Sequence, residues 1–84
     1  MSTVDVDDVR QLLDSDQEDP VMVLRQGKPL VIPAREQEAE EYRGTLFLTS
    51  RRTLLDQAGQ QGTSLPEMQR LAVTLSAMAD QLGA

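Results

Sequence analysis

The chain has 84 residues, a net charge of −6 and only two aromatic side chains, Tyr42 and Phe47. This length provides one small core, and a core with so few rings is only marginally stable alone. We therefore expect a homodimer, or a partner that completes the core. The sequence contains no histidine and no cysteine, which excludes the commonest general bases, metal ligands and thiol nucleophiles. We expect a non-catalytic protein that needs no metal, cofactor or small-molecule substrate.

The negative charge is concentrated near the N-terminus. Residues 1–20 contain seven acidic side chains and one base, Arg10, whereas the remainder of the chain is balanced. This asymmetry favours a basic partner over nonspecific attraction to nucleic acid. The apolar runs are too short for a membrane span, and the first residues lack the apolar stretch of a signal peptide. We therefore expect a cytoplasmic protein without membrane contact.

The first elements in chain order are a strand and a helix. Residues 3–6 alternate between polar and apolar side chains, which predicts a short strand. Apolar residues spaced three and four apart then predict a helix that is capped by Asp7. Pro20 ends this segment, because proline cannot continue a helix.

A β-hairpin comes next. The apolar runs at residues 21–25 and 29–33 flank a turn that contains Gly27, which is a good hairpin signal. The charged stretch 34–43 predicts a helix whose few inward contacts include Tyr42. Together with the strand at residues 3–6, the hairpin would form a small antiparallel sheet packed with helices. The expected fold class is therefore α+β.

The segment after the charged stretch is ambiguous. Residues 45–49 have the composition of a strand but lie between predicted helices, so both interpretations remain open. Ser50 can cap a short helix that extends to residue 58. Residues 59–63 are rich in glycine and glutamine and predict a linker.

The last element is an amphipathic helix within residues 64–84. Ser64 and Glu67 have the spacing of a capping box. The helix would follow a domain formed by residues 1–58, and it could either pack on that domain or bind a partner. As a partner-binding helix it would use an apolar stripe of six residues: Leu65, Met68, Leu71, Leu75, Met78 and Leu82.

The order of these motifs resembles the prevent-host-death (Phd/YefM) antitoxins. The opening TVDVDDVRQLL at residues 3–13 is similar to the family's strand and first helix. The stretch DPVMVLRQGKPLVI at residues 19–32 is similar to its hairpin, and Glu-Glu-Tyr at residues 40–42 to its next helix. The resemblance covers roughly residues 3–43, and only the order and spacing of the motifs make it specific.

The resemblance implies a dimeric antitoxin that represses its own operon. Its N-terminal part would hold operator DNA through Arg10 and Arg25, with Lys28 nearby, and its C-terminal part would neutralise a protein toxin. Guanidinium groups suit this role, since they bind phosphates and read guanine edges. Arg10 could instead pair with Asp7 or Asp14 on its own helix. The alternative function is a structural or adaptor protein that self-associates or docks on a basic partner without binding nucleic acid.

Overall fold

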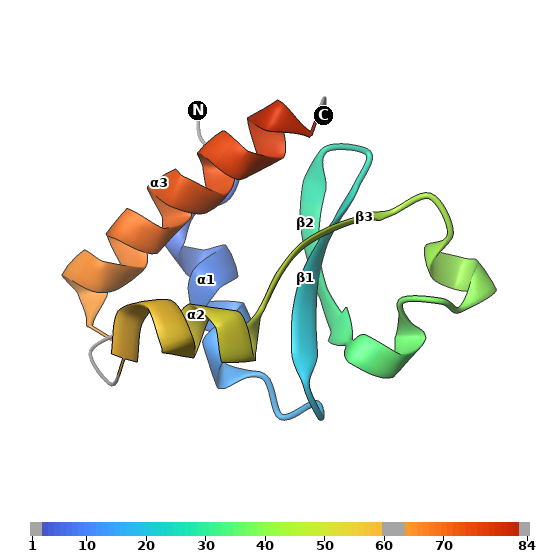
Figure 1. Ribbon diagram of the computed structural model, residues 1–84, viewed down its shortest axis with the longest axis horizontal. Coiled ribbons are helices and arrows are strands. Elements are labelled where there is room, and N and C mark those ends of the chain that lie inside the picture. The colour runs from blue at the N-terminus through green and yellow to red at the C-terminus, as the bar shows by residue number, and fades with distance from the viewer. Residues whose placement is uncertain (1–2, 60–63, 83–84) are drawn as a thin grey trace.

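A computed structural model describes residues 3–59 and 64–82 of the chain. The elements in chain order are α1 (Val6–Asp14), β1 (Pro20–Arg25), β2 (Lys28–Pro33), two 3-10 turns (Ala34–Glu36 and Glu40–Tyr42), β3 (Leu46–Ser50), α2 (Arg51–Ala58) and α3 (Leu65–Gln81). The strands form one antiparallel sheet in the order β2-β1-β3 (Figure 1). The expected α+β class, with a small antiparallel sheet and a C-terminal helix, is confirmed.

The predicted hairpin is formed by β1 and β2. Arg25 pairs with Lys28, and the two residues between them, Gln26 and Gly27, have φ angles of 53° and 78°. Positive φ at both loop positions is typical of a type I′ turn, whose twist matches that of the flanking strands. Gly27 adopts this conformation without the steric cost that a side chain would bring.

The third strand is not the one that the sequence predicted. Residues 3–6 form a bend and the start of α1, so the prediction of a strand there is wrong. The main chain of Val4 is held by the side chain of Ser76 instead of a sheet partner. Since β1 lies at the centre of the sheet, it needs a second neighbour for its backbone groups. The ambiguous segment supplies it, because β3 pairs with β1 with one register shift between Met22 and Val23.

Helix α1 begins two residues earlier than a cap at Asp7 would place it. Its cap is Asp5 and not Asp7, so that prediction is also wrong. The Asp5 carboxylate accepts a hydrogen bond from the backbone N of Asp8 at 3.2 Å, and the Asp8 carboxyl accepts one from the backbone N of Asp5 at 3.0 Å. This reciprocal arrangement satisfies two helix-end donors. Burial raises the pKa of the Asp8 carboxyl, and the nearby charges of Asp5 and Asp7 act in the same direction.

The helix predicted for residues 34–43 is also wrong, because this segment forms two separate 3-10 turns. The segment has too few apolar side chains to bury one continuous helical face. Its conformation is set by contacts to the hairpin at both ends. The backbone N of Ala34 donates to the carbonyl of Asp19 at 2.9 Å, and the Arg25 side chain donates to the carbonyl of Glu41 at 2.7 Å.

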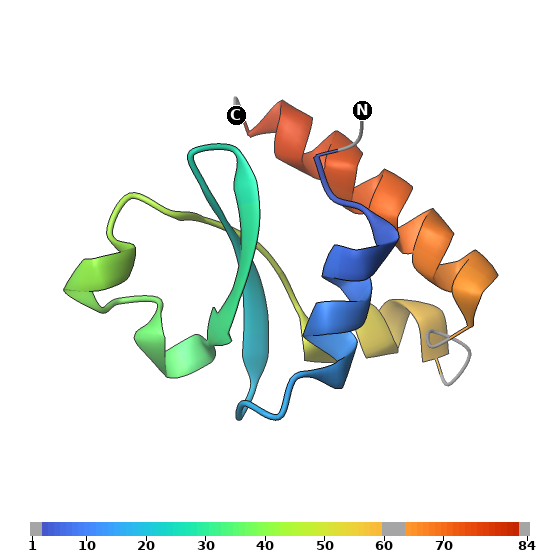
Figure 2. The same cartoon turned by 180° about the vertical axis from the view of Figure 1, so that it is seen from behind.

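The sheet is covered on both faces, as Figures 1 and 2 show from opposite sides. The helices cover one face, where Met22 and Leu24 of β1 and Leu48 of β3 join the larger core cluster. The 3-10 turns cover the other face, where Tyr42 packs against Val21 and Val23. Alternate residues of β1 therefore enter two different apolar clusters, as the period of a strand requires.

Helix α3 is part of the larger cluster. The Ser64 hydroxyl accepts a hydrogen bond from the backbone N of Glu67 at 3.4 Å, as the predicted cap requires. Leu75 is buried together with Val9 and Leu12 of α1. Helix α3 therefore packs on the rest of the chain and shares its core, which is one of the two arrangements that the sequence left open. Most of the expected linker, residues 60–63, lies outside the described residues.

Candidate functional site

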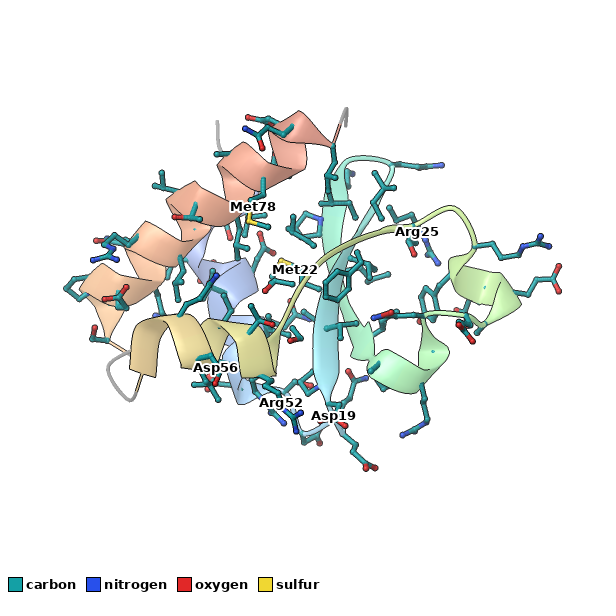
Figure 3. All side chains as sticks on the ribbon, in the orientation of Figure 1. Asp19, Met22, Arg25, Arg52, Asp56 and Met78 are labelled. Atoms are coloured by element: carbon teal, nitrogen blue, oxygen red, sulfur yellow. The ribbon has the colours of Figure 1, made fainter. Side chains whose placement is uncertain are left out.

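The first candidate surface is the end of the hairpin. Arg25 and Lys28 are both exposed and face each other as the pair that flanks the loop. Nη2 of Arg25 donates to the carbonyl oxygen of Glu41 at 2.7 Å. The guanidinium carbon lies 5.0 Å from the centroid of the Tyr42 ring, within the range of a cation–π contact. Figure 3 shows Arg25 directed towards the 3-10 turns. These contacts hold one cation in place beside a second, which is a geometry that suits a phosphate or a carboxylate.

Arg10 does not belong to this surface. It lies on α1, half-exposed, and its Nη1 is 3.8 Å from a carboxylate oxygen of Asp7. The pairing on its own helix, which the sequence left open, is therefore present. Helix α1 packs against the face of the sheet that contains Met22, whereas Arg25 contacts Tyr42 on the opposite face. The structure thus brings Arg25 and Lys28 together but leaves Arg10 apart.

The six stripe residues of α3 divide into two groups. Met68, Leu71 and Leu75 are buried in the larger core cluster. The other three residues are exposed to solvent, at 50% for Leu65, 39% for Met78 and 45% for Leu82. Only this second group is available to a partner while the helix stays in place.

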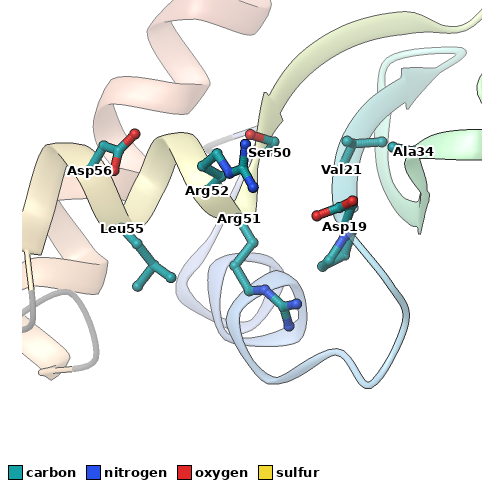
Figure 4. A pocket seen from close by; sticks show the side chains of 9 residues that line it. Asp19, Val21, Ala34, Ser50, Arg51, Arg52, Leu55 and Asp56 are labelled. Atoms are coloured by element: carbon teal, nitrogen blue, oxygen red, sulfur yellow. The ribbon is translucent and has the colours of Figure 1, made fainter.

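A groove lies between the start of β1 and α2, with a volume of about 470 Å³ (Figure 4). Its polar walls carry both signs of charge, from Arg52 and Asp56 on α2 and from Asp19 beside the start of β1 (Figure 4). Arg51 also lines it but donates to the carbonyl of Ser15 at 2.7 Å, which ties α2 to the loop after α1. The Ser50 hydroxyl accepts from the backbone N of Thr53 at 3.1 Å and serves as the cap of α2. Arg51 and Ser50 are therefore engaged in holding and capping α2 and are not free to bind a ligand in the groove.

Sequence reasoning missed the edge formed by β3. Leu46 is 42% exposed and Phe47 is 54% exposed, and both lie in a strand whose outer side pairs with no other strand of residues 3–59 and 64–82. The signal was present in the uncharged run Leu46–Ser50, which is rich in residues that favour strands. It was not interpretable because the pairing partner of this run was unknown.

Within residues 3–59 and 64–82, no group of three or more acidic side chains is arranged to hold a metal ion. Over the same residues, no helix combines the length and apolar character needed to cross a membrane. No protein-family model, curated protein or solved structure matches the chain.

Proposed function

We propose that this chain is a non-catalytic binding protein, and more specifically an antitoxin that neutralises a protein toxin and represses its own operon as a cytoplasmic dimer. The observation that carries the proposal is the contact between Arg25 and the segment Glu40–Tyr42. The resemblance to the prevent-host-death antitoxins rests on a hairpin arginine and a Glu-Glu-Tyr motif that are separate in sequence. The two motifs touch in the structure, which supports a common role for them.

The DNA-binding half of the proposal rests on the hairpin end. A guanidinium held by Tyr42 and Glu41 loses little further conformational freedom when it binds a phosphate, and Lys28 adds a second positive charge beside it. The acidic helix α1 packs on the opposite face of the sheet, so its charges are separated from Arg25 by the sheet itself. Arg25 and Lys28 are therefore better placed than Arg10 to approach a polyanion.

Gel-shift titration of the DNA upstream of the chain's own coding sequence, at low salt, tests this half. We expect Arg25→Ala and Lys28→Ala each to weaken binding and to reduce the slope of log affinity against log salt by about one. Arg70→Ala is the matched control, because Arg70 is an exposed arginine on α3 that pairs with Glu67 at 3.5 Å. The absence of any shift at low salt, or an equal loss in the control, would refute DNA binding through the hairpin.

The toxin-binding half is tested on the exposed part of α3. Deletion of residues 64–84 is a poor test, because it would remove buried core residues such as Leu75. We instead expect Met78→Asp and Leu82→Asp to abolish neutralisation of the product of the adjoining gene in a co-expression assay, while circular dichroism stays unchanged. Thr74→Asp, on an exposed position of the same helix, is the control. Full neutralisation by the Met78→Asp and Leu82→Asp variants would contradict a role for this surface.

The exposed acidic segment favours a second candidate function, an adaptor that docks on a basic protein. Among the described residues, the acidic side chains of residues 1–20 form only one ion pair, between Asp7 and Arg10. The carboxylates of Asp5 and Asp8 are engaged in the cap of α1. Those of Asp14, Asp16 and Glu18 form no ion pair within the described residues and can attract cations. If the chain is an adaptor, it should bind a lysine-rich peptide in a salt-sensitive manner, and the double variant Asp14→Asn, Asp16→Asn should lose this binding. It should also give no gel shift with DNA. A DNA shift that depends on Arg25 would favour the antitoxin.

A further inference from the structure

We infer that the outer edge of β3 is the surface through which two copies of this chain associate, by antiparallel pairing of β3 with β3 of the second copy. The inference rests on the proposed dimeric state and not on the DNA or toxin contacts. It deepens that proposal by naming the residues that form the dimer.

The two edges of the sheet differ in their capacity to pair. In a two-residue hairpin the flanking pair, here Arg25 and Lys28, exchanges hydrogen bonds, and every second pair does the same. The backbone N–H and C=O groups of β2 that point away from β1 therefore belong to residues 29, 31 and 33. Two of these are Pro29 and Pro33, which have no N–H to donate. Prolines at outward positions block the pairing of an edge strand. By contrast, β3 contains no proline and no charged residue.

The exposed side chains of β3 point to both faces of the sheet. Phe47 is paired with Val23, so it lies on the face covered by the 3-10 turns. Leu46 is paired with Leu24, so it lies on the face covered by α3. A helix docked on either face would bury only one of these side chains. A strand added to the edge would bury both, because its own side chains also alternate between the faces.

A second copy is the occupant that fits this edge. Antiparallel self-pairing of Leu46–Ser50 about a two-fold axis places only uncharged residues opposite one another. The acidic helix α1 makes its main sheet contacts with β2 and β1, so the bulk of its charge lies on the side of the sheet away from this interface. The joined sheet would end on both sides at β2, whose prolines prevent further addition, so that the assembly closes as a dimer. The register shift between Met22 and Val23 limits the backbone ladder, so Leu46 and Phe47 must supply most of the stabilisation.

Sedimentation velocity and light scattering of the purified chain test the inference. We expect the wild type to have twice the chain mass of 9.3 kDa. Leu46→Lys and Phe47→Lys should each raise the dissociation constant of the dimer by about tenfold or more and give monomers when combined. Both side chains are about half-exposed in the single chain, so lysine can extend into solvent at each position and circular dichroism of the variants should match that of the wild type.

Val73→Lys is the matched control, because Val73 is a 66% exposed apolar residue on α3 and not on β3. This variant should remain dimeric. Amide hydrogen exchange gives an independent readout: protection of Phe47 should increase with protein concentration, whereas protection of Val31 on the β2 edge should not. A wild type that stays monomeric, or a dimer that survives the combined lysine variant, would overturn the inference. Because DNA and toxin binding are measured separately, failure here is distinguishable from failure of those two contacts.

Discussion

The Ser76 hydroxyl provides the sharpest test of how the N-terminal segment is held. It accepts a hydrogen bond from the backbone N of Val4 at 2.9 Å and donates one to the carbonyl of the same residue at 2.8 Å. Val4 is fully buried and Ser76 nearly so. Ser76→Ala would leave a buried donor and a buried acceptor without partners, each at a cost of about 1–3 kcal/mol. We expect the free energy of unfolding to fall by about 2–6 kcal/mol, a large share of the stability of a small domain.

Urea denaturation followed by circular dichroism measures this loss. The slope of the transition should be unchanged, because the surface exposed on unfolding stays the same. Thr74→Ala is the control, since Thr74 is an exposed hydroxyl two residues away on the same helix. It should change stability by no more than about 0.5 kcal/mol. If Ser76→Ala is as stable as this control, the two hydrogen bonds do not hold the N-terminal segment on α3 and the reasoning fails.

Two further predictions concern the core and the cap of α1. Met22 is fully buried in the larger cluster, so Met22→Ala should lower the free energy of unfolding by about 2–5 kcal/mol in the same urea assay. The control Val73→Ala, at an exposed site, should change it by less than about 0.5 kcal/mol. Burial raises the pKa of Asp8, so the folded state binds its proton more tightly than the unfolded state, and the resulting stabilisation is lost as the pH rises through the folded pKa. The wild type should therefore lose stability relative to Asp8→Asn as the pH rises above the ordinary carboxyl value of 3.8. A constant difference, or one of opposite sign, would contradict the raised pKa.

The sequence by itself determined the elements whose signals are local. The hairpin follows from two apolar runs around Gln26-Gly27, because positive φ angles at both loop positions also fix the pairing of Arg25 with Lys28. Helices α2 and α3 follow from the serine caps that precede them. Each of these features depends on residues a few positions apart, which is the range over which backbone conformation and capping act.

Tertiary structure decided which elements are neighbours. Alternation at residues 3–6 indicated a strand, but β1 took β3 as its second neighbour, because a strand's face pattern does not specify its partner. The stripe on α3 showed that Leu75 must be buried, but only packing placed it on α1 and left Leu82 exposed. The same limit applied to the binding surfaces. Arg10 and Arg25 matched one family pattern, and the sheet between them separates the two side chains.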